Sequence, residues 1–232
     1  MDADIHAKKS TDGKRPPSHV YNCMLWVKTL WRKMRIIAGT YRSRPLAAPR
    51  GMDTRPTSDR LRETLFNILA PRIKGSRFLD LYAGTGAVGI EALSRGAEHV
   101  WFVENAAPAA KVIRANLASL KVASDYTLEI RKTSVALERM NGQGLTTDVI
   151  FLDPPYEAEA EYARTLEFLG STRGQMMLAD NAVVIAEHRS KTSLSEKYGA
   201  LERTRVVKQG DAALSFFAVR DAAVAEEKGA AP

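Results

Sequence analysis

Apolar segments and segments with helical periodicity alternate along residues 75–220, and this alternation constrains the fold more than any other feature. It predicts parallel strands joined by right-handed crossovers, with helices on both faces of the sheet. The expected strands are 77–84, 99–104, 126–131, 147–153, 181–188, 203–209 and 213–220. The expected helices between them are 88–94, 106–120, 134–140 and 158–169.

The last two expected strands are connected differently from the others. Only Gly210, Asp211 and Ala212 separate them, and glycine and aspartate are frequent turn residues, so these strands must form an antiparallel hairpin. The prediction is therefore an α/β fold with a doubly wound, seven-stranded, mostly parallel sheet that ends in an antiparallel hairpin.

The composition limits the number of domains and the kinds of site. The chain has 232 residues, 45% of them hydrophobic, which is enough for one core with at most a small appendage. The single cysteine, Cys23, excludes an internal disulfide and a cysteine-based zinc site, which fits a reducing cytoplasm. We expect no metal. We also expect no membrane segment, because the apolar run at 20–31 is short and interrupted.

The expected divisions are a disordered or weakly structured extension at 1–33, a strand, basic loop and helix at 34–74, the main domain at 75–220 and a disordered tail at 221–232.

Positive charge is concentrated in the first part of the chain. The formal net charge is +7, and residues 34–62 carry seven arginines and two aspartates. This segment is expected to form a strand at 35–40, an arginine-rich loop and a helix capped by Thr57 or Ser58, with Arg62 off its apolar face. A solvated surface is one interpretation of the arginines, but their accumulation with little compensating acid favours contact with RNA. The residues assigned to this contact are Arg42, Arg44, Arg55 and Arg60.

A glycine-rich loop follows the first strand of the main domain. In LDLYAGTGAVGIE, the residues Gly84, Gly86 and Gly89 form G-x-G-x-x-G between a strand and a helix, which lets the backbone approach a ligand closely. The motif alone fits a nicotinamide dinucleotide as well as S-adenosylmethionine, and a tight turn that needs glycine is a third interpretation.

Two strand-end acids favour S-adenosylmethionine. Asp80 stands four residues before Gly84, where a carboxylate would repel a pyrophosphate and attract the cationic methionine end of S-adenosylmethionine. Glu104 stands 20 residues after Gly84, where an acid can accept both ribose hydroxyls of an adenosine-containing cofactor. The predicted cofactor site also includes Tyr82 and Asn105, which adjoin these positions.

The stretch DVIFLDPPYEAEAEY places Asp153 and Pro154 at the end of the fourth expected strand. If Asp153 and the Pro154 carbonyl each accept one N–H of an exocyclic amine, the nitrogen can pyramidalise and direct its lone pair at a methyl group. Asp153 could also take the proton as it leaves. Pro155 helps to fix the backbone, and Tyr156 offers a ring on which an extruded base can stack. A strand-terminating turn with an incidental acid is the alternative.

These residues resemble those of known enzymes. Asp-Pro-Pro-Tyr after an apolar strand, downstream of a glycine loop, is similar to the amino-methyltransferases that act on adenine, cytosine or guanine. From Met34 to about Arg220 the chain resembles, in order and spacing, the RsmD family of bacterial 16S rRNA guanine-N2 methyltransferases. The segments that carry this resemblance are MRIIAGTYRSRPLAAP, RPTSDRLRETLFNIL, LDLYAGTGAVGIEALSRGA, FVE and LDPPY.

The resemblance implies a class I S-adenosylmethionine-dependent methyltransferase fold with an N-terminal strand and helix. It implies N2-methylguanine in 16S rRNA as the product, and an assembled or assembling 30S particle in the cytoplasm as the substrate. It also implies that residues 55–63 fold over the cofactor, with Thr57 and Arg62 contributing. Where many relatives present Asp or Asn to the adenine amino group, this chain has RKTSVAL, so Thr133 or Ser134 must substitute.

Three alternatives remain open at the level of sequence. An adenine-N6 or cytosine-N4 methyltransferase acting on DNA or another RNA would share the chemistry, although DNA readers usually carry a separate recognition domain for which 232 residues leave no space. A non-catalytic RNA-binding module would explain the arginines but not Asp153 and Tyr156. A nicotinamide-dependent enzyme would explain the glycine loop alone.

Overall fold

The computed structural model describes residues 34–48, 58–155 and 159–220. The expected extension at 1–33 and the expected tail at 221–232 lie outside these ranges. No helix within the described ranges is long and apolar enough to cross a membrane.

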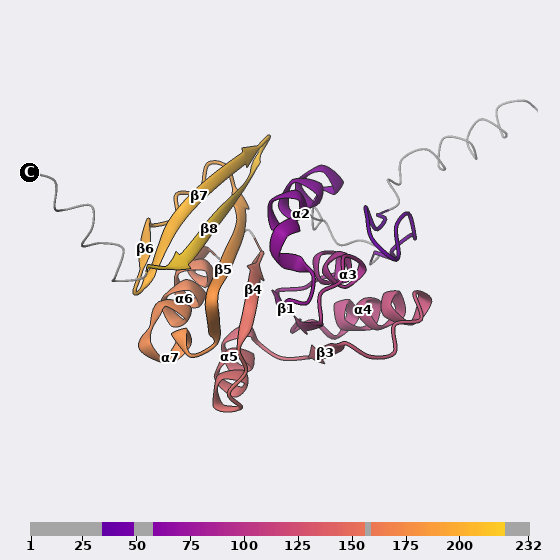
Figure 1. Ribbon diagram of the computed structural model, residues 1–232, viewed down its shortest axis with the longest axis horizontal. Helices are drawn as coiled ribbons and strands as arrows, with labels where there is room; N and C mark the ends of the chain where they lie inside the picture. Colours follow the sequence, from indigo (N-terminus) through magenta and orange to yellow (C-terminus); the bar gives the residue numbers. More distant parts are fainter. Residues whose placement is uncertain (1–33, 49–57, 156–158, 221–232) are drawn as a thin grey trace, which may run out of the picture. The chain divides into compact units, whose positions relative to one another are not determined.

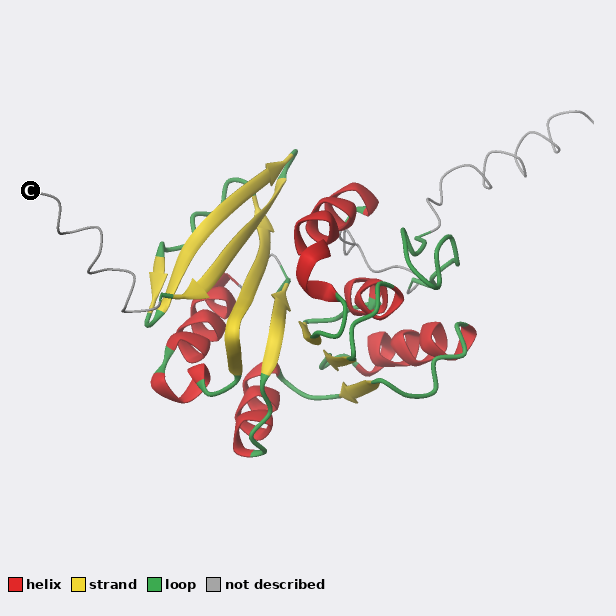
Figure 2. Cartoon of the chain, in the orientation of Figure 1, coloured by secondary structure: helices red, strands yellow, loops and turns green. Residues whose placement is uncertain are grey.

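The helices and strands follow the predicted alternation (Figures 1 and 2). The strands are β1 (Arg77–Leu81), β2 (His99–Val103), β3 (Tyr126–Glu129), β4 (Thr147–Leu152), β5 (Leu178–Arg189), β6 (Lys197–Tyr198), β7 (Leu201–Gln209) and β8 (Ala212–Val219). The helices are α2 (Asp59–Ile73), α3 (Ala87–Ser94), α4 (Ala107–Ser119), α5 (Thr133–Gly142), α6 (Glu159–Gly170) and α7 (Thr172–Gln175).

All the described strands join one sheet in the order β3-β2-β1-β4-β5-β8-β7-β6. Strands β1 to β5 are parallel, whereas β8 pairs antiparallel with β5 and with β7. This is the class I methyltransferase arrangement that the sequence predicts. The predicted count of seven strands was wrong, because the two-residue strand β6 pairs with the start of β7 and adds an eighth. So short a strand has no detectable alternation in the sequence.

Each face of the sheet carries its own helices and its own apolar cluster (Figure 1). Helices α2, α3 and α4 pack on one face, where Phe66 of α2 stacks on Phe78 of β1. Helices α5 and α6 pack on the other face, where Leu137 and Leu166 belong to the cluster. Because both faces are covered, β1 and β4 are buried almost throughout rather than alternately, as expected for a parallel sheet inside the fold.

Residues 34–48, called here the N-terminal loop, do not contain the predicted strand at 35–40. The chain turns back on itself, and only an isolated antiparallel bridge joins Arg35 to Pro45. The amides of Ile37 and Ala38 donate to the carboxylate of Glu91 in α3, at 2.8 and 3.0 Å, instead of to a neighbouring strand. A side chain from another element therefore satisfies the donors that a strand would have used.

Helix α2 begins as predicted and runs antiparallel to β5. Ser58 is its N-cap, and the Ser58 hydroxyl accepts a hydrogen bond from the Leu61 amide. Near the end of α2, the Arg72 guanidinium donates to the Asn181 carbonyl early in β5, whereas Thr64 contacts Gln209 at the end of β7. The amino end of α2 therefore lies at the edge of the sheet where β5 ends.

We predict that Gly89→Ala destabilises the fold by about 1–3 kcal/mol, because α3 lies too close to β2 to admit a methyl group. A Cβ atom at position 89 would lie 2.3 Å from Cε1 of Phe102 and 2.9 Å from Cγ1 of Val100. Urea unfolding monitored by circular dichroism measures the change. The matched control is Gly142→Ala at the end of α5, where a Cβ atom meets nothing within 4 Å. An equal effect of the two substitutions would contradict this account of the packing.

Candidate active site

Four acidic side chains meet at the carboxyl edge, the edge of the sheet where strands β1, β2, β4 and β5 end. Asp80 is in β1, Glu104 follows β2, Asp153 follows β4, and Glu187 lies in β5 one position after the pair formed by Leu152 and Ala186. Asp80, Glu104 and Glu187 are buried, and Asp153 is half-buried. Carboxylates gathered in a covered site repel one another, and such an arrangement is typical of functional sites.

The carboxyl of Asp153 is strongly perturbed by its surroundings. Burial raises the pKa of Asp153 well above its usual range, and the charges of Glu187 and Asp80 raise it further. Because Leu152 at the end of β4 pairs with Leu81 at the end of β1, Asp153 lies beside the strand that leads into the glycine loop. In the protein without ligand, this carboxyl therefore binds a proton more tightly than an ordinary aspartate.

Asp80 is held inside the turn between β1 and α3. Its carboxylate accepts a hydrogen bond of 2.8 Å from the Gly89 amide, and its side chain is almost completely buried. Burial raises the pKa of Asp80 to about 7; the Gly89 amide opposes this change, and the charge of Glu104 adds to it. The hydrogen bond fixes the first turn of α3 against the end of β1.

Glu104 organises the glycine loop from the neighbouring strand. One of its carboxylate oxygens accepts a hydrogen bond of 2.8 Å from the Gly84 amide, and the other accepts one of 2.7 Å from the Ala106 amide. Each carboxylate oxygen can accept a second hydrogen bond, so the predicted contact with ribose hydroxyls needs no loss of these two. Asn105, which follows Glu104, is exposed at the same turn.

The glycines of the loop have two different structural roles. Gly86 is the N-cap of α3 and adopts φ +76°, in the left-handed region that favours glycine. Gly89 instead allows α3 to approach β2, as its contact with Phe102 shows. The first turn of α3 thus presents backbone amides at the carboxyl edge, where they can bind a polar ligand.

Tyr82 connects the end of β1 to the helices of the opposite face. Its backbone has φ +60°, which is rare for a residue with a side chain and indicates local strain. Its hydroxyl donates to the carboxylate of Glu161 and shares a hydrogen bond with Thr165, both at 3.0 Å. Thr133, the buried first residue of α5, also bonds to this hydroxyl, so the structure brings together the predicted cofactor residues Tyr82 and Thr133.

The backbone after β4 leaves the sheet at once. Asp153, Pro154 and Pro155 belong to no helix or strand, with Pro154 buried and Pro155 exposed. The prolines prevent β4 from continuing, because they have no amide to donate. The predicted stacking residue Tyr156 lies outside the described residues, and so do Thr57 and Arg55.

The N-terminal loop is attached to the glycine loop from outside. The Thr85 hydroxyl contacts the sulfur of Met34 at 3.8 Å. The buried Asn116 side chain in α4 donates to the carbonyls of Thr85 and Ala47, and its oxygen accepts from the Ala47 amide at 2.8 Å. The conformation of residues 84–86 therefore depends on α4 and on the N-terminal loop as well as on the glycines.

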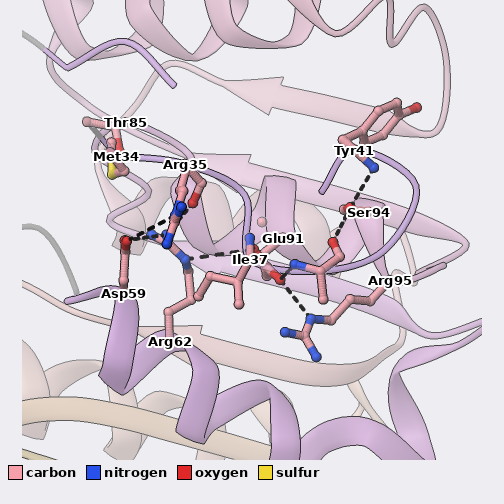
Figure 3. Close-up of polar contacts among 12 residues, drawn as sticks. Met34, Arg35, Ile37, Tyr41, Asp59, Arg62, Thr85, Glu91, Ser94 and Arg95 are labelled. Carbon is pink, nitrogen blue, oxygen red and sulfur yellow. Dashed lines mark hydrogen bonds and ion pairs between the residues drawn. The ribbon is translucent and has the colours of Figure 1, made fainter. Parts of the chain in front are cut away.

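A buried arginine and a buried glutamate join the N-terminal loop to α2 and α3 (Figure 3). Arg62 donates to the Arg35 carbonyl at 2.7 Å and to Asp59 at 3.0 Å, and its Nε lies 3.9 Å from the Glu91 carboxylate. Glu91 also accepts from Arg95 at 2.8 Å, in addition to the amides of the N-terminal loop. Burial lowers the pKa of Arg62, whereas Glu91, Asp59 and Glu187 raise it. Among the described residues, Nε and Nη1 of Arg62 have no hydrogen-bond partner.

This network corrects the prediction for Arg62. The residue was placed off the apolar face of α2, but its side chain is fully buried and is no part of an RNA-facing surface. Positions 62, 66, 69 and 73 recur at helical spacing, and all four are buried. Arg62 therefore lies on the buried face of α2, and a contribution to the cofactor site remains a prediction.

The described arginines among those assigned to RNA, Arg42, Arg44 and Arg60, do not form one surface. The amides of Thr40 and Tyr41 bond to Ser94 at the end of α3, and Arg44 donates to the Ser119 carbonyl at the end of α4. Arg42 and Arg44 thus lie at the ends of α3 and α4 that are remote from the glycine loop. For α3, the two ends are separated by the length of the helix, about 12 Å. Arg60 instead lies at the amino end of α2, at the carboxyl edge.

The sequence interpretation missed three residues of the site and its support. Glu187 lies in the apolar segment VVIAEH, and Glu91 is the single charged residue in the helix AVGIEALS. An isolated acid in an otherwise apolar segment is rarely buried without a partner, and this signal could have identified both. Asn116 had no comparable signal, because a polar residue in a helix is usually exposed.

Comparison with known proteins agrees with this geometry. The family model described as "Conserved hypothetical protein 95" matches residues 34–218. The YlbH protein of Bacillus subtilis is 35% identical over 187 residues, which is 81% of this chain and all of that protein. Ribosomal RNA small subunit methyltransferase D of Escherichia coli K12 is 35% identical over 162 residues, 70% of this chain and 78% of that protein. A solved structure of YhhF from Escherichia coli has a TM-score of 0.69 and 31% identity, and covers 82% of this chain and 99% of that chain.

The chain belongs to the RsmD family. The range matched by the family model contains Asp80, Glu104, Asp153 and Glu187, together with the N-terminal loop that supports the glycine loop. In this RsmD-family chain the acidic cluster and the glycine loop are therefore parts of one matched unit.

The raised pKa of Asp153 predicts a specific pH dependence of stability. The folded state holds this proton more tightly than the unfolded state, whose aspartate has a pKa of about 4. The contribution of Asp153 to the free energy of unfolding is therefore largest below about pH 4, and it decreases as pH rises through the folded-state pKa. Asp153→Asn should accordingly be more stable than the wild type at pH 8, with a smaller difference at pH 5, in urea unfolding.

Asp148→Asn serves as the control of opposite sign. Burial tends to raise the pKa of Asp148, but hydrogen bonds and the charge from Arg77 outweigh it and hold the pKa below its usual value. That substitution should destabilise the protein at neutral pH. A loss of stability at pH 8 in Asp153→Asn would contradict the proposed electrostatics of the cluster.

Proposed function

We propose that this chain transfers the methyl group of S-adenosylmethionine to the exocyclic N2 amine of a guanine in 16S rRNA. The observation that carries the proposal is the position of Asp153 at the carboxyl edge, beside Asp80 and the glycine loop, in a chain of the RsmD family. The relative from Escherichia coli is named a methyltransferase of small-subunit ribosomal RNA, which supports the substrate class. The substrate would be the 30S subunit or an assembly intermediate, which places the reaction in the cytoplasm.

The glycine loop and the strand-end acids would hold the cofactor. Glu104 keeps the Gly84 backbone in place and retains free lone pairs for ribose hydroxyls. The carboxyl of Asp80 has a pKa of about 7, so a nearby cationic group would favour its charged form. The predicted cofactor residues Tyr82, Asn105 and Thr133 lie at the same edge of the sheet.

Asp153 would act on the amine of the target base. A guanine N2 amine is a weak nucleophile, because its lone pair is delocalised into the ring. Hydrogen bonds from its two N–H groups to the Asp153 carboxylate and the Pro154 carbonyl would localise that lone pair and direct it at the methyl group. As the nitrogen–carbon bond forms and the sulfur–carbon bond breaks, positive charge develops on nitrogen. The Asp153 carboxylate stabilises this charge and can accept the proton.

A methylation assay tests the proposed reaction and its target together. The purified chain is incubated with labelled S-adenosylmethionine and with 30S particles from cells that lack this gene, and the 16S rRNA is mapped by mass spectrometry. A new N2-methylguanine at one position is the expected result. Transfer to DNA, or to an adenine or cytosine amine, would overturn the proposal in favour of the alternative amino-methyltransferases.

We predict that Asp153→Ala lowers the methylation rate by at least about 100-fold, because it removes the acceptor of the amine N–H and of the developing charge. Cofactor affinity, measured by isothermal titration calorimetry, should stay near that of the wild type. The matched control is Asp180→Ala, which removes an exposed acid at the opposite end of β5 and should leave the rate unchanged. Full activity in Asp153→Ala would exclude the proposed role.

Glu187 should set the pH range in which Asp153 works. Its charge raises the pKa of Asp153, after burial and ahead of Asp80, so Glu187→Gln should lower that pKa. The acid limb of the pH profile of kcat/KM should then move to lower pH, because the carboxylate form is the active one. Glu167→Gln, which changes an exposed acid of α6, should leave the profile in place. An unshifted profile in Glu187→Gln would show that the two acids are not coupled.

A further inference from the structure

The turn between β7 and β8 lies next to the end of β5 at the carboxyl edge. Gln209 pairs with Ala212, and Ala212 pairs with Arg189 at the end of β5. Arg189 lies two positions beyond Glu187, which itself follows the pair formed by Leu152 and Ala186. The β7–β8 turn therefore stands beside the acidic cluster and projects beyond it.

The amino end of α2 lies next to the same turn. The hydroxyl of Thr64 contacts the Gln209 side chain at 3.3 Å and donates to the Arg60 carbonyl at 3.0 Å. Arg60 is one helical turn nearer than Thr64 to the amino end of α2. The turn after β5 is also adjacent, because the Ser190 amide donates to the Asp211 carbonyl at 2.8 Å. Three separate segments of the chain thus meet at this side of the carboxyl edge.

These segments carry exposed cations, here called the hairpin surface: Arg60, Lys191, Arg205 and Lys208. In the described part of the chain, none of the four forms an ion pair with an acid. Other arginines of the fold behave differently, since Arg203, also in β7, pairs with Glu196, which precedes β6. Exposed cations without acidic partners, beside a site for a polyanionic substrate, are available to bind phosphates.

The hairpin surface extends around both sides of β7. Val207 packs on the apolar cluster that faces α2, and Arg205 lies two positions before it on the same face. Lys208 follows Val207 in the strand and therefore faces the opposite side, opposite Ala213, which itself pairs with the buried His188. Burial lowers the pKa of His188, and the charges of Arg203 and Lys208 lower it further. A strand with cations on both faces can follow a nucleic-acid backbone that passes over its end.

We propose that the hairpin surface binds the phosphates of the RNA strand that flanks the target nucleotide, on the β5 side of Asp153. The proposal rests on the proposed function, and it adds a C-terminal contact that the charge distribution along the sequence does not suggest. An extruded base needs its backbone held on at least one side of the pocket, and the hairpin surface supplies cations at that place. Arg42 and Arg44 supply no cation at that place, because they lie at the remote ends of α3 and α4.

The test is the paired charge reversal Arg205→Glu and Lys208→Glu in the full chain. We expect the KM for 30S particles to rise by about tenfold or more, and the salt dependence of log KM to become shallower by about one unit per lost phosphate contact. The value of kcat and the affinity for S-adenosylmethionine should not change, because neither residue lies in the acidic cluster. The paired control reverses Lys74 and Lys121, exposed lysines at the ends of α2 and α4 on the opposite edge of the sheet.

The outcomes separate this inference from the proposed function. Suppose that the wild type methylates 16S rRNA and that the Arg205/Lys208 and Lys74/Lys121 charge reversals have the same KM. The hairpin surface then does not bind RNA, and this inference is wrong while the proposed function stands. If the wild type transfers no methyl group to rRNA, the proposed function and the inference fall together. The neutral double variant Arg205→Gln and Lys208→Gln keeps most of the side-chain packing, and it should show a smaller increase in KM if charge is the cause. An unchanged KM in this variant, with a melting temperature equal to that of the wild type, would also overturn the inference.

Discussion

The site depends on two buried carboxylates that bind main-chain amides. Asp80 accepts a hydrogen bond from the Gly89 amide, and Glu104 accepts one from the Gly84 amide. The ends of β1 and β2 therefore hold the two ends of the glycine loop. Hydrogen bonds to charged acceptors are stronger than neutral ones, and in a covered site they gain further strength. Glycine alone would leave the loop free to adopt many conformations. The two acids convert that freedom into one backbone shape.

The same acids make the protein less stable than a neutral set of side chains would. The charge of Glu104 raises the pKa of Asp80, and the charges of Glu187 and Asp80 raise the pKa of Asp153. The described part of the chain places only Arg62 near this cluster as a buried cation. A bound sulfonium, and the positive charge that develops on the amine, would each relieve this repulsion. The electrostatic cost of the free protein is therefore available to favour cofactor binding and the transition state.

Much of the fold followed from the sequence, because burial on both faces of a parallel sheet produces apolar strands separated by helices. The Gly-Asp turn between β7 and β8 likewise determined the antiparallel end of the sheet. Strand β6 was not predictable because two residues show no alternation, whereas the N-terminal loop was not predictable because it depends on contacts with distant residues. The Ile37 and Ala38 amides bind Glu91, which is more than 50 positions away. The positions of Asp80, Glu104 and Asp153 followed from the rule that parallel strands end at one edge.

Arg62 shows why surface and core arginines cannot be separated by composition. It belongs to the arginine-rich segment 34–62, yet its side chain is fully buried between the N-terminal loop and α3. Two nitrogens of this buried guanidinium have no hydrogen-bond partner within the described ranges, which is costly, so other groups must compensate for it. The negative charges of Glu91, Asp59 and Glu187 do so, and Glu187 belongs to the acidic cluster itself. Removing Arg62 would therefore take a positive charge away from Glu91, Asp59 and Glu187, and would leave the N-terminal loop without its hydrogen bond at the Arg35 carbonyl. One side chain thus couples the support of the glycine loop to the charge balance of the site.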